Sequence, residues 1–311
     1  MLMYLARRLI YAVPTMMLVI ALTFTLGYYA PGDPIVSMYG QSMPPSPKAV
    51  QQLHHAYGLD RPYLVQLADY TQKAMRGHFG ESISLQRGVT PAITAALPIS
   101  AKLGLTAFVL LILIGIPISI VAATHHNSLL DHMTVGATVA INATPAFVLI
   151  PVIMLVFVLK LNLFNVPTGW HGLFSMQSIL PVVVLTIGPL SWFVRTFRAA
   201  ILEALSAQHV RTAHAKGLPG GDVLWWHVIR NALPAGVSAL ALCVPGFFVG
   251  SFFVESIFAI PGFGKLSVQA LQKYDYPLIL GTAIVTAGVV IVSNLLADVV
   301  AYALDPGGHH G

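Results

Sequence analysis

Charged residues are scarce in this sequence of 311 residues. Only 9% of the residues are Asp, Glu, Lys or Arg, whereas soluble domains carry about 25%. Hydrophobic residues make up 56% of the chain, and its mean hydropathy is +0.78. So few charges cannot cover the surface of a soluble fold of this length. The composition therefore argues against an ordinary soluble protein and predicts a surface that faces lipid.

Cysteine is nearly absent as well. Cys243, within an apolar run, is the only one, which excludes a disulfide within the chain and a thiolate metal site. We expect it to be a small buried hydrophobe. A phosphate-binding loop is also missing, because the nearest match, at 261–266, has the wrong spacing. With no Gly-x-Ser-x-Gly motif either, we predict a protein that is not an enzyme and binds no cofactor itself.

Histidine, by contrast, is plentiful, with twelve residues. Imidazole is a common metal ligand, and the histidines gather at His54-His55, at His125, His126 and His132, and at His309-His310. These groups lie in different segments and lack carboxylate or thiolate partners at a fixed spacing, so we predict no metal site. The net charge of +5 comes from dispersed basic residues that follow apolar runs. That pattern favours membrane topology over nucleic-acid binding.

Six segments are long and apolar enough to cross a membrane as helices, which takes about 20 residues each. They are 9–30, 99–123, 134–159, 179–197, 232–254 and 278–304. Prolines within several of them are tolerated in transmembrane helices. The prediction is an all-α integral membrane protein with six transmembrane helices. It divides into an N-terminal helix (1–30), a loop region (31–98), a five-helix core (99–306) that contains the loop 198–231, and a flexible tail (307–311).

The distribution of Lys and Arg predicts the orientation. If the N-terminus is cytoplasmic, the inside segments hold Arg7, Arg8, Arg195, Arg198, Arg211, Lys216 and Arg230, and the short outside loops hold Lys160, Lys265 and Lys273. This bias agrees with the positive-inside rule, and a loop as long as 31–98 translocates largely regardless of its charge. We therefore expect both termini and the loop 198–231 in the cytoplasm, with 31–98 outside.

The loop 198–231 is the most highly charged of the short connections. Strong helix formers lead to Gly217, which suits the end of a helix. The following Pro-Gly-Gly predicts a turn, and Asp222 is a good N-cap for a second helix through Asn231. Such a helix pair either rests on the membrane surface, with Trp225 and Trp226 at the interface, or enters a groove on a cytoplasmic partner.

The run from Val210 to Ala235 resembles the coupling-helix signature of binding-protein-dependent ABC importer permeases. That signature reads Glu-Ala-Ala, three residues, Gly, nine residues and Ile-x-Leu-Pro. Here Arg211-Thr212-Ala213 occupies the first slot, Gly217 the second and His227–Arg230 the last. The departures from the general signature follow the form of the dipeptide, oligopeptide and nickel branch, in which Arg-Thr-Ala-x-Ala-Lys-Gly-Leu precedes His-x-x-Arg-Asn-Ala-Leu.

The resemblance extends over nearly the whole chain and is strongest to the first, or B-type, of two paired permeases. The other matching segments are Tyr4–Leu9, Pro31–Pro34, Gly58–Pro62, Val254–Gly264 and Ala303–Pro306. It implies import of di- or oligopeptides across the cytoplasmic membrane of a prokaryote. Import of nickel or another small solute is an alternative. A proton-coupled secondary transporter is a second, less favoured alternative, because the inverted repeats and mid-membrane ionisable residues typical of that class are not evident in this sequence.

The resemblance also implies the partners. They are a second homologous permease, two ABC ATPases that bind ATP and Mg²⁺, an extracytoplasmic substrate-binding protein and membrane lipid. The residues expected to couple this chain to an ATPase are Arg211, Thr212, Ala213, Lys216, Gly217 and Leu218. Arg211 and Lys216 would pair with acidic groups on the ATPase, and Gly217 would allow close backbone approach.

A few polar residues within the predicted spans are candidates for the transport path or its gate. Asn142 and Asn294 either line the path or form hydrogen bonds between helices. Glu255 acts at an outer gate or on substrate, or is simply a charge at a helix end. Asp298 is either functional or reaches the membrane interface.

Overall fold

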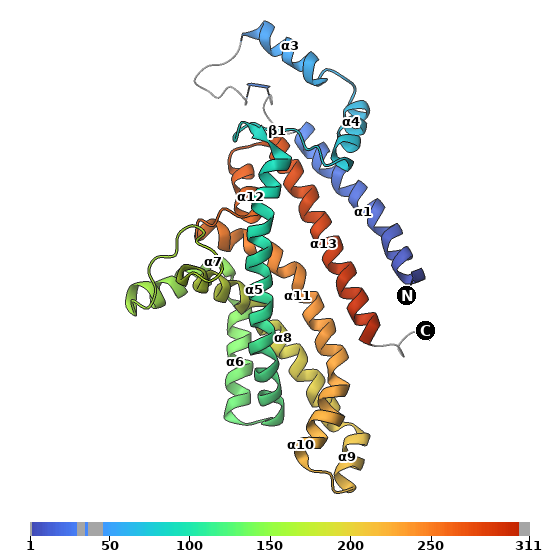
Figure 1. Cartoon of the computed structure of the whole chain (residues 1–311), viewed down its shortest axis with the longest axis vertical. Helices are drawn as coiled ribbons and strands as arrows, with labels where there is room; N and C mark the ends of the chain where they lie inside the picture. Colours follow the sequence, from blue (N-terminus) through green and yellow to red (C-terminus); the bar gives the residue numbers. More distant parts are fainter. Residues whose placement is uncertain (1, 30–34, 37–45, 305–311) are drawn as a thin grey trace. The chain divides into compact units, whose positions relative to one another are not determined.

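The computed structural model describes residues 2–29, 35–36 and 46–304, and most of them are helical (Figure 1). The Pro31–Pro34 motif and the tail 307–311, with its two histidines, lie outside these residues. The longer helices are α1 (Leu2–Tyr28), α5 (Val89–Thr124), α6 (Leu129–Ala143), α8 (Met176–Ser206), α11 (Arg230–Ile257) and α13 (Tyr276–Leu304). The shorter ones are α3 (Pro47–Tyr57), α4 (Tyr63–Met75), α7 (Ala146–Met154), α9 (Gln208–Ala215), α10 (Gly220–Asp222) and α12 (Phe263–Gln272).

Five helical stretches are long and apolar enough to cross a membrane. They are Ile10–Tyr28, Val89–Thr124, Met176–Ser206, Gly220–Ile257 and Tyr276–Val300. A sixth arises if α6 and the helix that follows it count as one span. The only strands in the described residues, β1 (Glu81–Ser82) and β2 (Arg87–Gly88), form a short antiparallel hairpin with Glu81 opposite Gly88. The all-α membrane class is therefore confirmed.

The span predicted over 134–159 is interrupted. Helix α6 ends at Ala143, and the chain resumes as α7 and a π-helical turn, η1 (Leu155–Lys160), bent by 115° from α6. The break falls at Thr144 and Pro145, which have extended backbone angles. Proline lacks an N–H for the helix and disfavours helical geometry in the residue before it, so this sequence interrupts the span.

The chain divides into two compact units. The first comprises Met1–Leu5, Ser100–Ile260 and Val290–Gly311, and the second comprises Ala6–Ile99 and Pro261–Val289. In the second unit, Ile20, Ala74 and Ile284 form a small core with Met16, Tyr70 and Phe79. In the first unit, α8 packs against α11 and α6, and most of the buried residues of α8 are apolar.

The first unit is held together where glycines let helices approach aromatic rings. Phe193 and Phe197 of α8 stack with ring centroids 5.5 Å apart, and both are almost fully buried. A Cβ atom on Gly115 of α5 would lie 2.7 Å from Phe193, and one on Gly236 of α11 would lie 2.5 Å from Phe197. The two glycines therefore allow α5 and α11 to pack closely on α8.

The second unit contains a buried carboxylate, Asp275, immediately before α13. Its Oδ2 accepts hydrogen bonds from the Ser82 hydroxyl (2.6 Å) and the Ser84 N–H (2.8 Å), and its Oδ1 accepts one from the Leu278 N–H (3.3 Å). Burial by itself raises the pKa of Asp275, but these hydrogen bonds outweigh it and hold the pKa below its ordinary value. Asp275 thus caps α13 and fixes the segment that follows β1.

Candidate functional site

The segment between α8 and α11 is a hairpin at the end of the two packed helices, formed by residues 207–222 and called the α9 hairpin below (Figure 1). The sequence predicted a connection over 198–231 whose first half is helical as far as Gly217, and in the structure residues 198–206 of that connection belong to α8. Helix α8 continues to Ser206 because its helix-forming residues keep an apolar face, with Ile201 and Ala204 buried. The break comes at Ala207, which has extended backbone angles.

Helix α9 ends as the sequence predicted, at a glycine. Gly217 has a φ of +79°, in the left-handed region that favours glycine. Its N–H donates to the His214 carbonyl (2.9 Å), and the Leu218 N–H donates to the Ala213 carbonyl (3.4 Å). These two bonds form a Schellman motif, so Gly217 turns the chain sharply at the tip of the hairpin.

The predicted cap of the second helix is wrong. That helix begins at Gly220, with Pro219 at the N-cap, and Asp222 lies inside its first turn with helical angles and no capping bond. Nor does the helix end at Asn231. It continues through a π-helical turn, η2 (Val223–Ile229), into α11 and reaches Ile257. Pro219 lacks an N–H and has a fixed φ, so it suits the position just before a helix, and Asp222 is still favourable near the positive end of the helix dipole.

The inner face of α9 is fastened to η2. Val210 and Ala213 of α9 are buried, as are Val223 and Val228 of η2. Polar contacts complete the attachment, because His209 Nε2 lies 3.2 Å from the His227 carbonyl oxygen and 3.0 Å from Asn231 Nδ2. Asn231 Nδ2 also donates to the His227 carbonyl at 2.6 Å. Helix α9 is therefore attached to the start of the α11 span by both apolar and polar contacts.

The outer face of the hairpin is basic and exposed. Of the six residues predicted to couple the chain to a partner, Arg211, Thr212, Lys216, Gly217 and Leu218 are exposed. The sixth, Ala213, is buried and packs inside the hairpin. Residues 207–221 contain no Asp or Glu. Trp225 and Trp226 are also exposed, on the turn that follows. This surface suits an acidic or apolar partner.

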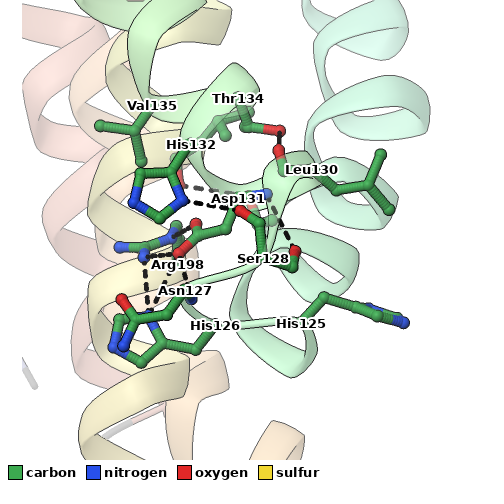
Figure 2. A network of polar contacts seen from close by, with 12 residues as sticks. His125, His126, Asn127, Ser128, Leu130, Asp131, His132, Thr134, Val135 and Arg198 are labelled. Atoms are coloured by element: carbon green, nitrogen blue, oxygen red, sulfur yellow. Dashed lines mark hydrogen bonds and ion pairs between the residues drawn. The ribbon is translucent and has the colours of Figure 1, made fainter.

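A polar network that no pattern in the sequence predicted joins α8 to the turn before α6 (Figure 2). Arg198 Nε donates to Asp131 Oδ1 and Arg198 Nη2 donates to Asp131 Oδ2, each at 2.6 Å. Oδ2 also accepts the Asn127 N–H at 3.0 Å and lies 3.1 Å from His126 Nδ1. The Asp131 N–H donates to Ser128 Oγ at 3.3 Å. The network is a bidentate ion pair surrounded by further hydrogen bonds.

The residues predicted for a path or gate lie on three different helices. Glu255 is fully buried near the end of α11, rather than open to water at the helix end. Asn142 of α6 is exposed, and its Nδ2 donates to the Thr138 carbonyl of its own helix at 2.9 Å. Asn294 of α13 is exposed. Their roles stay predictions. Within the described residues, no group of three His, Cys, Asp or Glu could hold a metal ion.

Comparisons with known proteins agree with this architecture. Residues 115–308 match the family described as the inner membrane component of binding-protein-dependent transport systems. Residues 1–104 match the N-terminal part of such membrane components. Together the two matches take in α1, α8, α11, α13 and the α9 hairpin, and all of α5 except residues 105–114.

Named relatives match over nearly their whole length. The oligopeptide transport system permease protein OppB of Haemophilus influenzae is 32% identical over 307 residues, which are 98% of this chain and 99% of OppB. The dipeptide transport system permease protein DppB of Bacillus subtilis is 32% identical over 305 residues, 97% of this chain and 96% of DppB. These similarities and the helical membrane fold show that the chain belongs to the family of inner membrane permease components of binding-protein-dependent transport systems.

Proposed function

We propose that this chain is the B-type permease of a peptide importer and that it moves di- or oligopeptides into the cytoplasm. The permeases to which it is similar are named for oligopeptide and dipeptide transport, and they match it from end to end. The observation that carries the mechanism is the α9 hairpin, which is exposed and basic on its outer face and fastened to a membrane span on its inner face.

The energy for transport comes from other subunits. This sequence has no phosphate-binding loop, so ATP and Mg²⁺ bind to two ABC ATPases on the cytoplasmic side. The tip of the α9 hairpin enters a groove on one ATPase, with Arg211 and Lys216 facing acidic groups there. A second permease completes the path, and an extracytoplasmic binding protein delivers the peptide.

The attachment of the hairpin suits it to transmit force. Closure of the ATPase dimer displaces the tip, and the buried contacts of α9 with η2 carry that displacement into α8 and α11, which pack on each other. Because packed interfaces switch between discrete arrangements rather than deform continuously, the helices move as bodies. The path then opens alternately to either side of the membrane.

Reconstitution tests this function. We expect proteoliposomes that contain both permeases, both ATPases and the binding protein to import labelled dipeptides or oligopeptides only when ATP is present. The purified chain alone should neither bind nor hydrolyse ATP, because it lacks the residues that hold phosphate. Nickel uptake by the same vesicles, with no peptide uptake, would contradict the proposed substrate. ATP hydrolysis by the single chain would contradict the proposal that separate subunits hydrolyse ATP.

A further inference from the structure

The Asp131–Arg198 ion pair joins α8, the helix that leads to the α9 hairpin, to the beginning of α6. Arg198 and the hairpin are joined by the last residues of α8, which contain neither proline nor glycine. Eight residues, 199–206, lie between Arg198 and Ala207, which is about 13 Å along a straight helix. Ile201 and Ala204 on this stretch are buried. The end of α8 is therefore a short, stiff connection from the hairpin to the ion pair.

On the other side of the pair, Asp131 belongs to the beginning of α6 and is held by the turn that joins α5 to α6. The Asn127 N–H donates to its carboxylate, and its own N–H donates to Ser128 Oγ (Figure 2). Asn127 has a φ of +62°, and this backbone conformation helps to reverse the direction of the chain between α5 and α6. Asp131 is thus bound to the α5–α6 turn as well as to α8.

The pair differs from an ordinary surface salt bridge in its burial and geometry. The side chain of Asp131 is 4% exposed and that of Arg198 is 15% exposed, so solvent screens their attraction less than that of an exposed pair. Both carboxylate oxygens are bound by one guanidinium, which fixes the orientation as well as the distance. A lysine at position 198 would supply the positive charge, but its ammonium group would lack the planar, bidentate geometry of the guanidinium.

We propose that the Asp131–Arg198 pair is a positioning element of the transport cycle, which locks the end of α8 to the α5–α6 turn. When the α9 hairpin moves, the pair makes α5 and α6 move with α8 instead of letting α8 slide past them. Arg198 and Asp131 act through the helices they join and touch neither ATP nor peptide. This inference rests on the proposed function, because it assumes that the hairpin is displaced by an ATPase.

The test measures coupling rather than activity alone. In the reconstituted complex, the number of ATP molecules hydrolysed per peptide imported is compared for wild type, Arg198→Gln and Arg198→Lys. We expect Arg198→Gln to raise this ratio by about fivefold or more, as when two coupled sites lose their linkage. Arg198→Lys should lie in between, because it keeps the charge without the bidentate contact.

Two further variants separate positioning from folding. Arg198→Gln leaves Asp131 as a buried charge without its guanidinium, so the double variant Asp131→Asn/Arg198→Gln removes both charges, and we expect it to raise the ratio equally. The matched control is Arg195→Gln, which removes an exposed charge one turn earlier on α8 and should leave the ratio unchanged.

The outcomes are distinguishable. If uptake and ATP hydrolysis fall in proportion in both Arg198 variants and in the double variant, the pair only stabilises the fold, and the inference is wrong. If the wild-type complex itself shows no ATP-dependent peptide uptake, the proposed function is overturned, and the positioning role falls with it.

Discussion

Replacement of Gly217 by tryptophan is expected to abolish ATP-driven uptake while the complex remains assembled in the membrane. Gly217 has a φ of +79°, and no side chain lies within 4 Å of the position its Cβ would occupy. Tryptophan is therefore not excluded by its neighbours in the chain. It strains the backbone by about 1–2 kcal/mol and places a bulky ring at the tip that we propose enters the ATPase groove. Uptake and ATP hydrolysis are measured on the same vesicles.

The control for Gly217→Trp is Gly217→Asn. Asparagine tolerates the left-handed conformation better than most residues and adds little bulk, so we expect it to retain most of the uptake. Asparagine and tryptophan both add a Cβ atom, but only tryptophan fills the contact surface. Wild-type uptake by Gly217→Trp would show that the tip of the hairpin is not a contact surface.

Replacement of Gly236 by alanine is expected to destabilise the chain by about 1–3 kcal/mol, the usual cost of overpacking a core. The added Cβ would lie 2.5 Å from the ring of Phe197. That ring cannot retreat easily, because it is buried and stacked on Phe193, which itself presses against Gly115. Thermal unfolding of the purified protein in detergent measures the loss.

Two variants test the cause of that loss. Gly246→Ala, on the same helix, adds a Cβ that meets nothing within 4 Å, and we expect no loss of stability from it. Gly236→Ala/Phe197→Leu replaces the blocking ring with a smaller side chain, and we expect it to recover part of what Gly236→Ala loses. Equal stability of Gly236→Ala and Gly246→Ala would mean that α8 and α11 do not pack as described.

Most of the fold can be predicted from the length of the apolar segments. The apolar segments predicted around 9–30, 99–123 and 278–304 are helices, because a long run without charges has few alternatives in lipid. The break at Pro145 was missed because transmembrane helices tolerate proline, and composition does not tell a kink from an interruption. The sequence predicted a helix up to Gly217 but placed it in a connection separate from the span, whereas residues up to Ser206 continue α8, because a helix that leaves the membrane can keep a buried face. The break at Ala207 was not predicted, since helix-forming residues lie on both sides of it.

The candidate site was predictable only in part. The tip of the hairpin was found because glycine at a helix end has a local signature, and Gly217 has the expected geometry. The Asp131–Arg198 pair joins residues 67 positions apart, and no local pattern relates them. The same holds for the contacts of His209 with His227 and Asn231. Whether the hairpin faces the cytoplasm stays a prediction from the distribution of Lys and Arg.

Photo-crosslinking from position 218 tests the central claim most directly. Leu218 is 40% exposed at the tip of the α9 hairpin, so a photoreactive residue there can crosslink to whatever the tip contacts. In the assembled importer, we expect the main crosslinked product to join this chain to an ATPase subunit. Crosslinks to lipid or to the extracytoplasmic binding protein, with none to an ATPase, would contradict a hairpin that takes up force from ATP hydrolysis.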